Sequence, residues 1–155
     1  MSLTVAAPAD LGIEVLQVTE GSPVELDLRL EAVMEGVLVT GTAHASLAGE
    51  CARCLEPISD DIEVRFQELF VYEDHALPEE DDEVSMLQGD LVDLEPLLRD
   101  AVVLALPVNP LCREDCPGLC TECGVHWDEL PEGHTHQQVD PRWAALSNLT
   151  VSTEE

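Results

Sequence analysis

The sequence contains no lysine, and apart from histidine its only basic side chains are six arginines. Against them stand 33 aspartates and glutamates, which gives a formal net charge of -27 at pH 7 in 155 residues. The arginines occupy positions 29, 53, 65, 99, 113 and 142. Proteins that grip nucleic acids neutralise phosphates with a basic patch, so this composition argues against binding to naked RNA. It also argues against an anionic membrane surface, and it favours a basic protein partner.

Aromatic residues and long apolar runs are also scarce. Aromatic side chains make up 3% of the chain, too few to predict a platform for stacking bases. No apolar run approaches the ~20 residues that a transmembrane helix requires. Residues 1–10 contain no basic residue and no stretch apolar enough for a secretory signal. We therefore expect a cytoplasmic protein whose cysteines stay reduced and bind metal rather than form disulfides.

The first two thirds of the chain show the pattern of an antiparallel sheet followed by a helix. Apolar and charged residues alternate over 24–32, and a period of two continues over 37–47 after a turn, which predicts a hairpin. Further strands are expected at 62–66 and within 11–18. Apolar residues at helical spacing then predict one long packed helix over 94–106, which ends before a proline.

These elements indicate an α+β fold in which the helix covers an antiparallel sheet, with closure into a barrel-like form considered as an option. We expect residues 1–109 to form this β-rich core, with an acidic loop at 73–83. Residues 110–155 are expected to add a Cys/His metal-binding segment that resembles a zinc ribbon. A C-terminal helix is expected to begin at Asp140-Pro141. The two parts are expected to make one compact unit.

The six cysteines occur as three close pairs, followed by two histidines. These residues are Cys51 and Cys54, Cys112 and Cys116, Cys120 and Cys123, and then His134 and His136. A Cys-x2-Cys turn lets two thiolates converge on one ion, and two such pairs complete a tetrahedral zinc site. The order along the chain favours two sites, one made by the first four cysteines and one by the last two cysteines with both histidines. Structural zinc contributes on the order of 10–16 kcal/mol in small peptides, enough to order a loop-like segment.

Other assignments of these residues stay open at this point. A single all-cysteine site would use Cys51, Cys54, Cys120 and Cys123, and His126 could replace either of the later histidines. Iron–sulfur ligation suits the histidines and the ribbon-like knuckle less well than zinc does. The expected number of zinc ions is therefore one or two.

No enzyme emerges from the sequence. It contains neither a phosphate-cradling glycine loop nor a recognisable nucleophile–base arrangement. A zinc-dependent hydrolase would need a site with three protein ligands and an exchangeable water. A thiol redox protein would need Cys51 and Cys54 to be free of metal, with at least one depressed thiol pKa. Both are alternatives to a non-enzymatic metal-binding protein.

Four stretches of the sequence resemble a known bacterial family. They are Cys51-Ala-Arg-Cys-Leu55, Leu91 to Asp100 continuing into Leu106-Pro-Val-Asn-Pro-Leu-Cys112, Cys116-Pro-Gly-Leu-Cys-Thr-Glu-Cys-Gly124, and Asp140-Pro-Arg-Trp-Ala-Ala-Leu146. In this order and spacing they resemble the YceD-like family, known as large ribosomal RNA subunit accumulation proteins. The resemblance extends from the first predicted hairpin to Leu149.

The resemblance implies a cytoplasmic role in making or maintaining large-subunit (23S) ribosomal RNA, with no known catalytic activity. Family genes commonly neighbour that of a large-subunit ribosomal protein, which fits assembly. The metal ligands carry over only in part, because this chain has His134-x-His136 where many relatives have Cys-x-Cys. Some relatives lack most of the later cysteines, so zinc is expected to be structural in this chain without being required for the function that the family shares. We expect a ribosome-biogenesis factor whose acidic surface holds a basic ribosomal protein or steers it to the pre-ribosomal particle.

Overall fold

The computed structural model describes residues 1–73, 85–136 and 142 of the chain. Most of the expected acidic loop and the expected C-terminal helix lie outside these residues. The chain divides into unit 1 (Met1–Cys116) and unit 2 (Pro117–Glu155). In the described parts, unit 1 contains the strands and the α-helix, and unit 2 contains one short 3-10 helix, η1 (Trp127–Glu129). Neither of these two helices has the length and apolar character that a membrane span demands.

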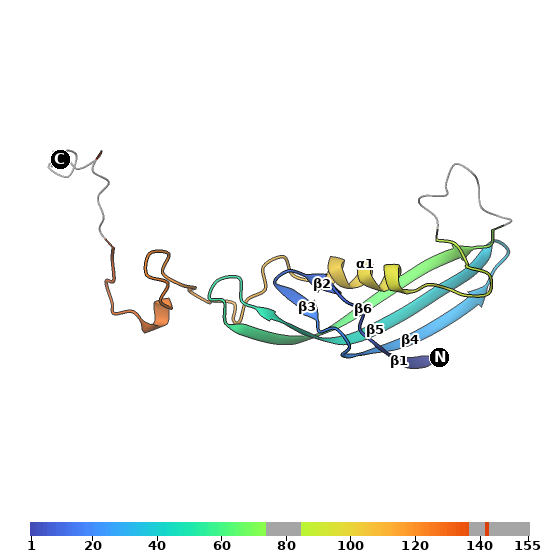
Figure 1. Ribbon diagram of the computed structural model, residues 1–155, viewed down its shortest axis with the longest axis horizontal. Helices are drawn as coiled ribbons and strands as arrows, with labels where there is room; N and C mark the ends of the chain where they lie inside the picture. The colour runs from blue at the N-terminus through green and yellow to red at the C-terminus, as the bar shows by residue number, and fades with distance from the viewer. Residues whose placement is uncertain (74–84, 137–141, 143–155) are drawn as a thin grey trace, which may run out of the picture. The chain divides into compact units, whose positions relative to one another are not determined.

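Unit 1 is built on a six-stranded antiparallel sheet (Figure 1). The strands are β1 (Ser2–Ala6), β2 (Gly12–Ile13), β3 (Leu16–Val18), β4 (Pro23–Ala32), β5 (Gly36–Glu50) and β6 (Pro57–Val71). The central strand is β5, and β6 pairs with its whole length. The other edge of β5 pairs first with β4 and then, beyond Ala45, with β3. β1 extends the sheet outside β4, and β2 extends it outside β3.

The sheet is open, so the barrel-like form considered from the sequence is wrong. The strand order is β1-β4-β5-β3-β2, with β6 on the remaining edge of β5, and no pairing joins the outermost strands among the described residues. A barrel forms only when tilted and staggered strands bring the first and last edges together. β2 and β3 have two and three residues and are too short to carry the sheet around. The helix covers the apolar face instead, which gives an antiparallel sheet with one helix of the α+β kind.

The helix α1 (Glu95–Ala105) lies against the sheet and contacts β6 and β2 (Figure 1). The Asp93 carboxylate accepts the backbone N–H of Glu95 at 3.0 Å, which satisfies one of the free donors at the start of the helix. Arg99 ties the helix to the loop before β2, because its guanidinium donates to the backbone oxygens of residues 9 and 10. The same guanidinium also binds Glu95 at 3.0 Å.

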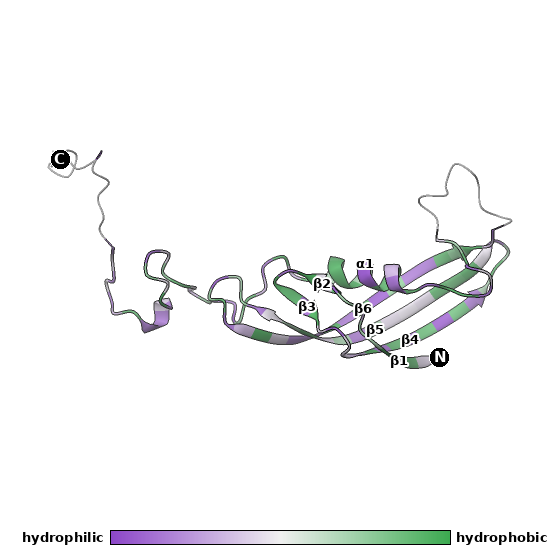
Figure 2. Cartoon of the chain, in the orientation of Figure 1, coloured by the Kyte–Doolittle hydropathy of each residue, from purple (hydrophilic) through white to green (hydrophobic). Residues whose placement is uncertain are grey.

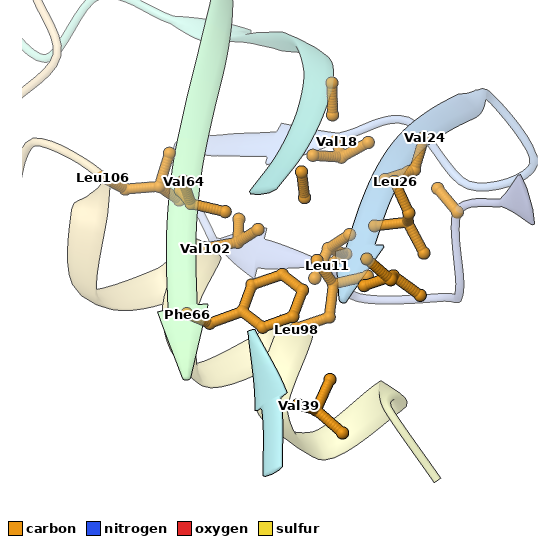
Figure 3. Packing of buried hydrophobic residues seen from close by; sticks show 14 of the residues in the cluster. Leu11, Val18, Val24, Leu26, Val39, Val64, Phe66, Leu98, Val102 and Leu106 are labelled. Carbon is orange, nitrogen blue, oxygen red and sulfur yellow. The ribbon is translucent and has the colours of Figure 1, made fainter. Parts of the chain in front are cut away.

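The hydrophobic core lies between α1 and the apolar face of the sheet (Figure 3). Hydrophobic and hydrophilic residues alternate along the long strands (Figure 2), so one face of each strand is apolar. Buried side chains of this core include Val24, Leu26, Val39, Val64, Phe66, Leu98 and Val102. Gly41 gives Phe66 its space, since a Cβ at Gly41 would lie 2.5 Å from the Phe66 ring. Unit 1 thus has a hydrophobic core of its own.

Two leucines of α1 test this packing. Leu98 is 5% exposed and Leu104 is 86% exposed. Leu98→Ala should lower the free energy of unfolding by about 2–5 kcal/mol, because it removes buried methyl groups and leaves a cavity. Leu104→Ala is the matched control and should change it by no more than about 0.5 kcal/mol. Urea unfolding followed by circular dichroism measures both. Equal effects of the two substitutions would contradict the placement of the helix.

Candidate metal centres

The turn between β5 and β6 forms a cysteine knuckle over residues 51–55. The backbone N–H of Cys51 donates to the oxygen of Glu56 at 2.8 Å, and that of Leu55 donates to the oxygen of Cys51 at 2.9 Å. Leu55 adopts a φ of 61°, a left-handed conformation that strains an L-residue. Cys51 and Cys54 are both buried in this turn. The turn therefore brings two thiols to one point at the end of the sheet.

The segment that follows α1 brings two more cysteines, Cys112 and Cys116, to this knuckle. The backbone N–H of Ala52 donates to the oxygen of Pro110 at 2.8 Å. The guanidinium of Arg53 donates to the backbone oxygen of Cys116 at 2.8 Å. These bonds attach backbone oxygens of the segment to the knuckle, so the approach of the thiols does not depend on the thiols alone.

The four thiols converge, and we call Cys51, Cys54, Cys112 and Cys116 the four-cysteine cluster. The sulfurs of Cys51 and Cys116 lie 3.8 Å apart, and those of Cys54 and Cys112 lie 3.6 Å apart. All four sulfurs lie within 4.8 Å of one another. A disulfide needs about 2.05 Å between its sulfurs, and all four cysteines are free. The spacing leaves room for one metal ion among the four sulfurs.

Without a cation, the close packing of the four thiols opposes the ionisation of all of them. Burial acts to raise the pKa of Cys51, but backbone N–H groups of Cys112, Arg53 and Cys54 outweigh it and lower that pKa to about 6. The backbone of Glu56 acts to lower the pKa of Cys54, but burial and the neighbouring thiols together raise that pKa to about 12. One thiol therefore ionises readily while its neighbour is held protonated. A metal cation would supply the charge needed to ionise both.

Unit 2 contains a second knuckle, over residues 120–124, with the same backbone turn as the first. The N–H of Cys120 donates to the oxygen of Val125 at 2.8 Å, and the N–H of Gly124 donates to the oxygen of Cys120 at 2.8 Å. Both bonds have the same sequence spacing as those of the first knuckle. The residue with positive φ is here Gly124, at 70°, which takes this conformation without strain. The shared turn indicates that both segments present a pair of cysteine sulfurs in the same way.

Two histidines complete a second group, and we call Cys120, Cys123, His134 and His136 the Cys–His cluster. The Nε2 atom of His134 lies 3.6 Å from the sulfur of Cys123. The rings of His134 and His136 are perpendicular, with centroids 4.4 Å apart. One ligand atom from each of the four residues lies within 4.8 Å of the others. Backbone hydrogen bonds from Cys123 and Glu122 lower the pKa of Cys120, which favours the thiolate that a metal binds.

His126 and Trp127 lie beside the Cys–His cluster. The Nδ1 atom of His126 accepts the backbone N–H of Asp128 at 3.2 Å, so the ring caps η1. The Trp127 ring contacts His134 edge to face, with centroids 5.7 Å apart. Trp127 thus packs against a potential ligand and restricts the orientation of its ring.

The structure gathers the eight residues that the sequence singled out into two groups of four. These groups match the two-site assignment favoured from the sequence, and metal binding by them stays a prediction. The sequence did not reveal that Arg53 binds the Cys116 backbone oxygen or that Leu55 has a positive φ. The position of Leu55 relative to Cys51 equals that of Gly124 relative to Cys120, and this shared spacing was the available signal.

Comparison with known proteins places this sequence in a family. The sequence matches the family "Large ribosomal RNA subunit accumulation protein YceD" over residues 39–150. The chain belongs to the YceD family. The match includes all eight residues of the two clusters. It confirms the resemblance seen in the sequence, and membership suggests a role in the accumulation of ribosomal RNA rather than a known enzymatic activity.

Relatives of this YceD-family chain occur in bacteria. An uncharacterized protein of Mycobacterium tuberculosis is 51% identical over 148 residues, which cover 94% of this chain and 71% of that protein. An uncharacterized protein of Mycobacterium leprae is 42% identical, with 94% and 68% covered. YlbN of Bacillus subtilis, also uncharacterized, is 29% identical over 135 residues, with 86% and 78% covered. No solved structure matches the chain.

The positive φ of Gly124 in the second knuckle predicts that adding one methyl group there weakens zinc binding. A Cβ at Gly124 would meet no atom within 4 Å, so only its positive φ opposes a side chain there. Gly124→Ala should therefore weaken the affinity of the Cys–His cluster for Zn²⁺, the probe ion, by about tenfold, since the left-handed conformation costs an L-residue about 1–2 kcal/mol. Competition with a zinc indicator measures the affinity.

Thr121→Ala is the control for this measurement, because it lies in the same knuckle and Thr121 has no positive φ. It should leave the affinity for Zn²⁺ unchanged. An unchanged affinity in Gly124→Ala would show that metal binding does not require the turn described above.

Proposed function

We propose that this YceD-family chain is a non-enzymatic, zinc-binding ribosome-biogenesis factor that supports the accumulation of 23S ribosomal RNA through a basic protein partner in the cytoplasm. The observation that carries the proposal is the family match, which spans residues 39–150. The two clusters support the zinc part of the proposal, and the charge of the chain supports the kind of partner.

Zinc is the ion that best fits the donors in both clusters. Four thiolates, or two thiolates with two imidazoles, are ligand sets of structural zinc sites, which are tetrahedral and closed. A Zn–S distance of about 2.3 Å places the sulfurs of a tetrahedral site about 3.8 Å apart. The two sulfur pairs of the four-cysteine cluster lie 3.8 Å and 3.6 Å apart. Four protein ligands leave no position for the exchangeable water of a zinc hydrolase.

The arginines of the described chain favour a protein partner over naked RNA. Those at positions 29, 65, 99 and 113 lie within 3.3 Å of a carboxylate oxygen, and Arg53 binds a backbone oxygen. Binding a phosphate would require these guanidinium groups to leave their present partners. Lysine, which could take their place, does not occur in the sequence.

The exposed face of the sheet carries acidic residues that a basic partner would complement. Glu25 on β4 and Glu63 on β6 flank His44 of β5 in one cross-strand row, and all three are wholly or partly exposed. Asp61 of β6 lies nearby and accepts a hydrogen bond from Ser46 of β5 at 2.7 Å. Together with the net charge of -27, this surface would attract a basic ribosomal protein and repel phosphates.

Metal content tests the zinc part of the proposal. Elemental analysis of the purified full chain should give two zinc ions per chain, with all six thiols unreactive towards a thiol reagent until a chelator is added. The thiols are masked because coordination occupies the sulfur lone pairs. One zinc with two reactive thiols would contradict the two-site assignment. No zinc, together with oxidised cysteine pairs, would contradict the zinc function altogether.

Depletion of the protein in its own bacterium tests the cellular role. The ratio of 23S to 16S ribosomal RNA should fall and should recover when the wild-type chain is supplied. An unchanged ratio would contradict the role in 23S accumulation.

Binding assays test the nature of the partner. The purified chain should bind basic proteins extracted from large ribosomal subunits, and this binding should weaken as salt rises from about 50 to 200 mM, because exposed charges are screened. Protein-free 23S RNA is the comparison and should bind weakly throughout. Tight binding of the RNA at about 150 mM salt, the physiological range, would contradict the proposed mechanism.

A further inference from the structure

Residues 117–136, the continuous described segment of unit 2, have no hydrophobic core. Gly118 and Cys120 are its buried residues, and the hydrophobic core cluster of the protein contains no residue of this segment. Val125 and Trp127 are exposed by 37% and 42%. Segments of this size cannot bury enough apolar surface to offset the entropy lost on folding, and they usually depend on a metal or a disulfide.

The hydrogen bonds within this segment are also local. The knuckle bonds join residues four or five positions apart, and the N–H of Trp127 donates to the oxygen of Gly118 at 3.0 Å. A single bridge pairs Leu119 with His126. The turn that carries His134 meets the knuckle at the Cys–His cluster and also contacts the Trp127 ring. The ligands of this cluster therefore join the two ends of the segment.

The two clusters depend on the fold in opposite ways. The four-cysteine cluster takes its ligands from the β5–β6 turn and from the segment after α1, and backbone bonds and the core of unit 1 position both. The Cys–His cluster takes all four ligands from unit 2. Loss of its ion would remove no tie within unit 1, whereas unit 2 would lose the contact that closes it.

The ligands also differ in exposure. Three of the four residues in the four-cysteine cluster are buried, and Cys112 is the exposed member. In the Cys–His cluster, Cys123 and His136 are exposed, His134 is half-buried and Cys120 is buried. A chelator or a competing thiol can reach exposed ligands without unfolding a core. Local opening is also easiest where buried apolar contacts are few.

We propose that the Cys–His cluster is an exchangeable zinc site whose occupancy decides whether residues 117–136 are folded, while the core of unit 1 keeps its fold when this ion leaves. The inference rests on the zinc-binding part of the proposed function. It adds that the two zinc ions have different structural roles. The ion in the four-cysteine cluster further stabilises unit 1, which already has a hydrophobic core. The ion in the Cys–His cluster stabilises the fold of residues 117–136, so the chain has two states that differ in this segment.

The first experiment compares zinc release from the two clusters in the full-length, zinc-loaded chain. Excess EDTA is added, released zinc is followed with an indicator, and zinc per chain is counted by native mass spectrometry. We expect two phases of one zinc each, with rate constants that differ by about tenfold or more, because opening is easier in the coreless segment. Release of both ions at one rate would overturn the inference.

A matched pair of variants assigns the phases. Cys112 and Cys123 are each an exposed member of their cluster. Cys123→Ser should remove the fast phase and Cys112→Ser the slow one. Hydrogen exchange measured by mass spectrometry should show that Cys123→Ser abolishes protection in peptides from 117–136 and leaves β4, β5 and β6 unchanged. In Cys112→Ser, protection of 117–136 should persist. Protection of 117–136 in the Cys123→Ser chain, or loss of protection in the strands, would overturn the inference.

Trp127 provides a second readout for the Cys–His cluster, because its ring lies 5.7 Å from that of His134. The chain has two tryptophans, so Trp143→Phe leaves Trp127 as the only one. Its emission should change with the fast phase and should not change with the slow phase. The reverse order would overturn the inference. The number of zinc ions per chain distinguishes failure of the proposed function from failure of this inference. A chain without bound zinc would contradict the proposed zinc function. Two zinc ions released together would contradict only the inference that the two clusters behave differently.

Discussion

The pairing of β5 along both of its edges is the interaction on which the rest of unit 1 depends. β6 follows its whole length on one edge, and β4 and β3 share the other. Because both edges are hydrogen-bonded, alternate residues of β5 are held on fixed faces, and the apolar face receives α1. The turn that leaves β5 after Glu50 then has a defined direction. That turn carries Cys51 and Cys54, so the first candidate metal centre is a product of the sheet.

The second candidate centre depends less on apolar burial than the first. Both centres use the same knuckle turn, with the first cysteine bonded to residues four and five positions later. In unit 1 this turn is anchored by a packed sheet and tolerates a strained Leu55. In residues 117–136 of unit 2 the turn has no hydrophobic core of that segment beside it, and Gly124 takes the positive φ without strain. The same local chemistry is therefore supported by apolar burial in one unit and by its own ligands in the other.

Some elements were predictable from the sequence because their signals are local. The alternation in β4 and β5 and the helical spacing of Leu98 and Val102 depend on neighbours in the chain, and the structure has strands and a helix there. The openness of the sheet was not predictable, because closure depends on strand lengths and stagger across the whole sheet. The role of Arg53 was missed for the same reason, since its acceptor, the oxygen of Cys116, lies 63 positions away.

The sequence by itself determined the charge, the family and the identity of the candidate ligands. These properties depend on which side chains are present and how they are spaced, and neither changes when the chain folds. Only the tertiary structure decided which cysteines meet, because Cys51 and Cys116 are 65 positions apart in the sequence and their sulfurs lie 3.8 Å apart in the fold. It also decided which ligands are buried. Burial depends on what packs around a residue, and in this protein three ligands of the four-cysteine cluster are buried, against one ligand of the Cys–His cluster.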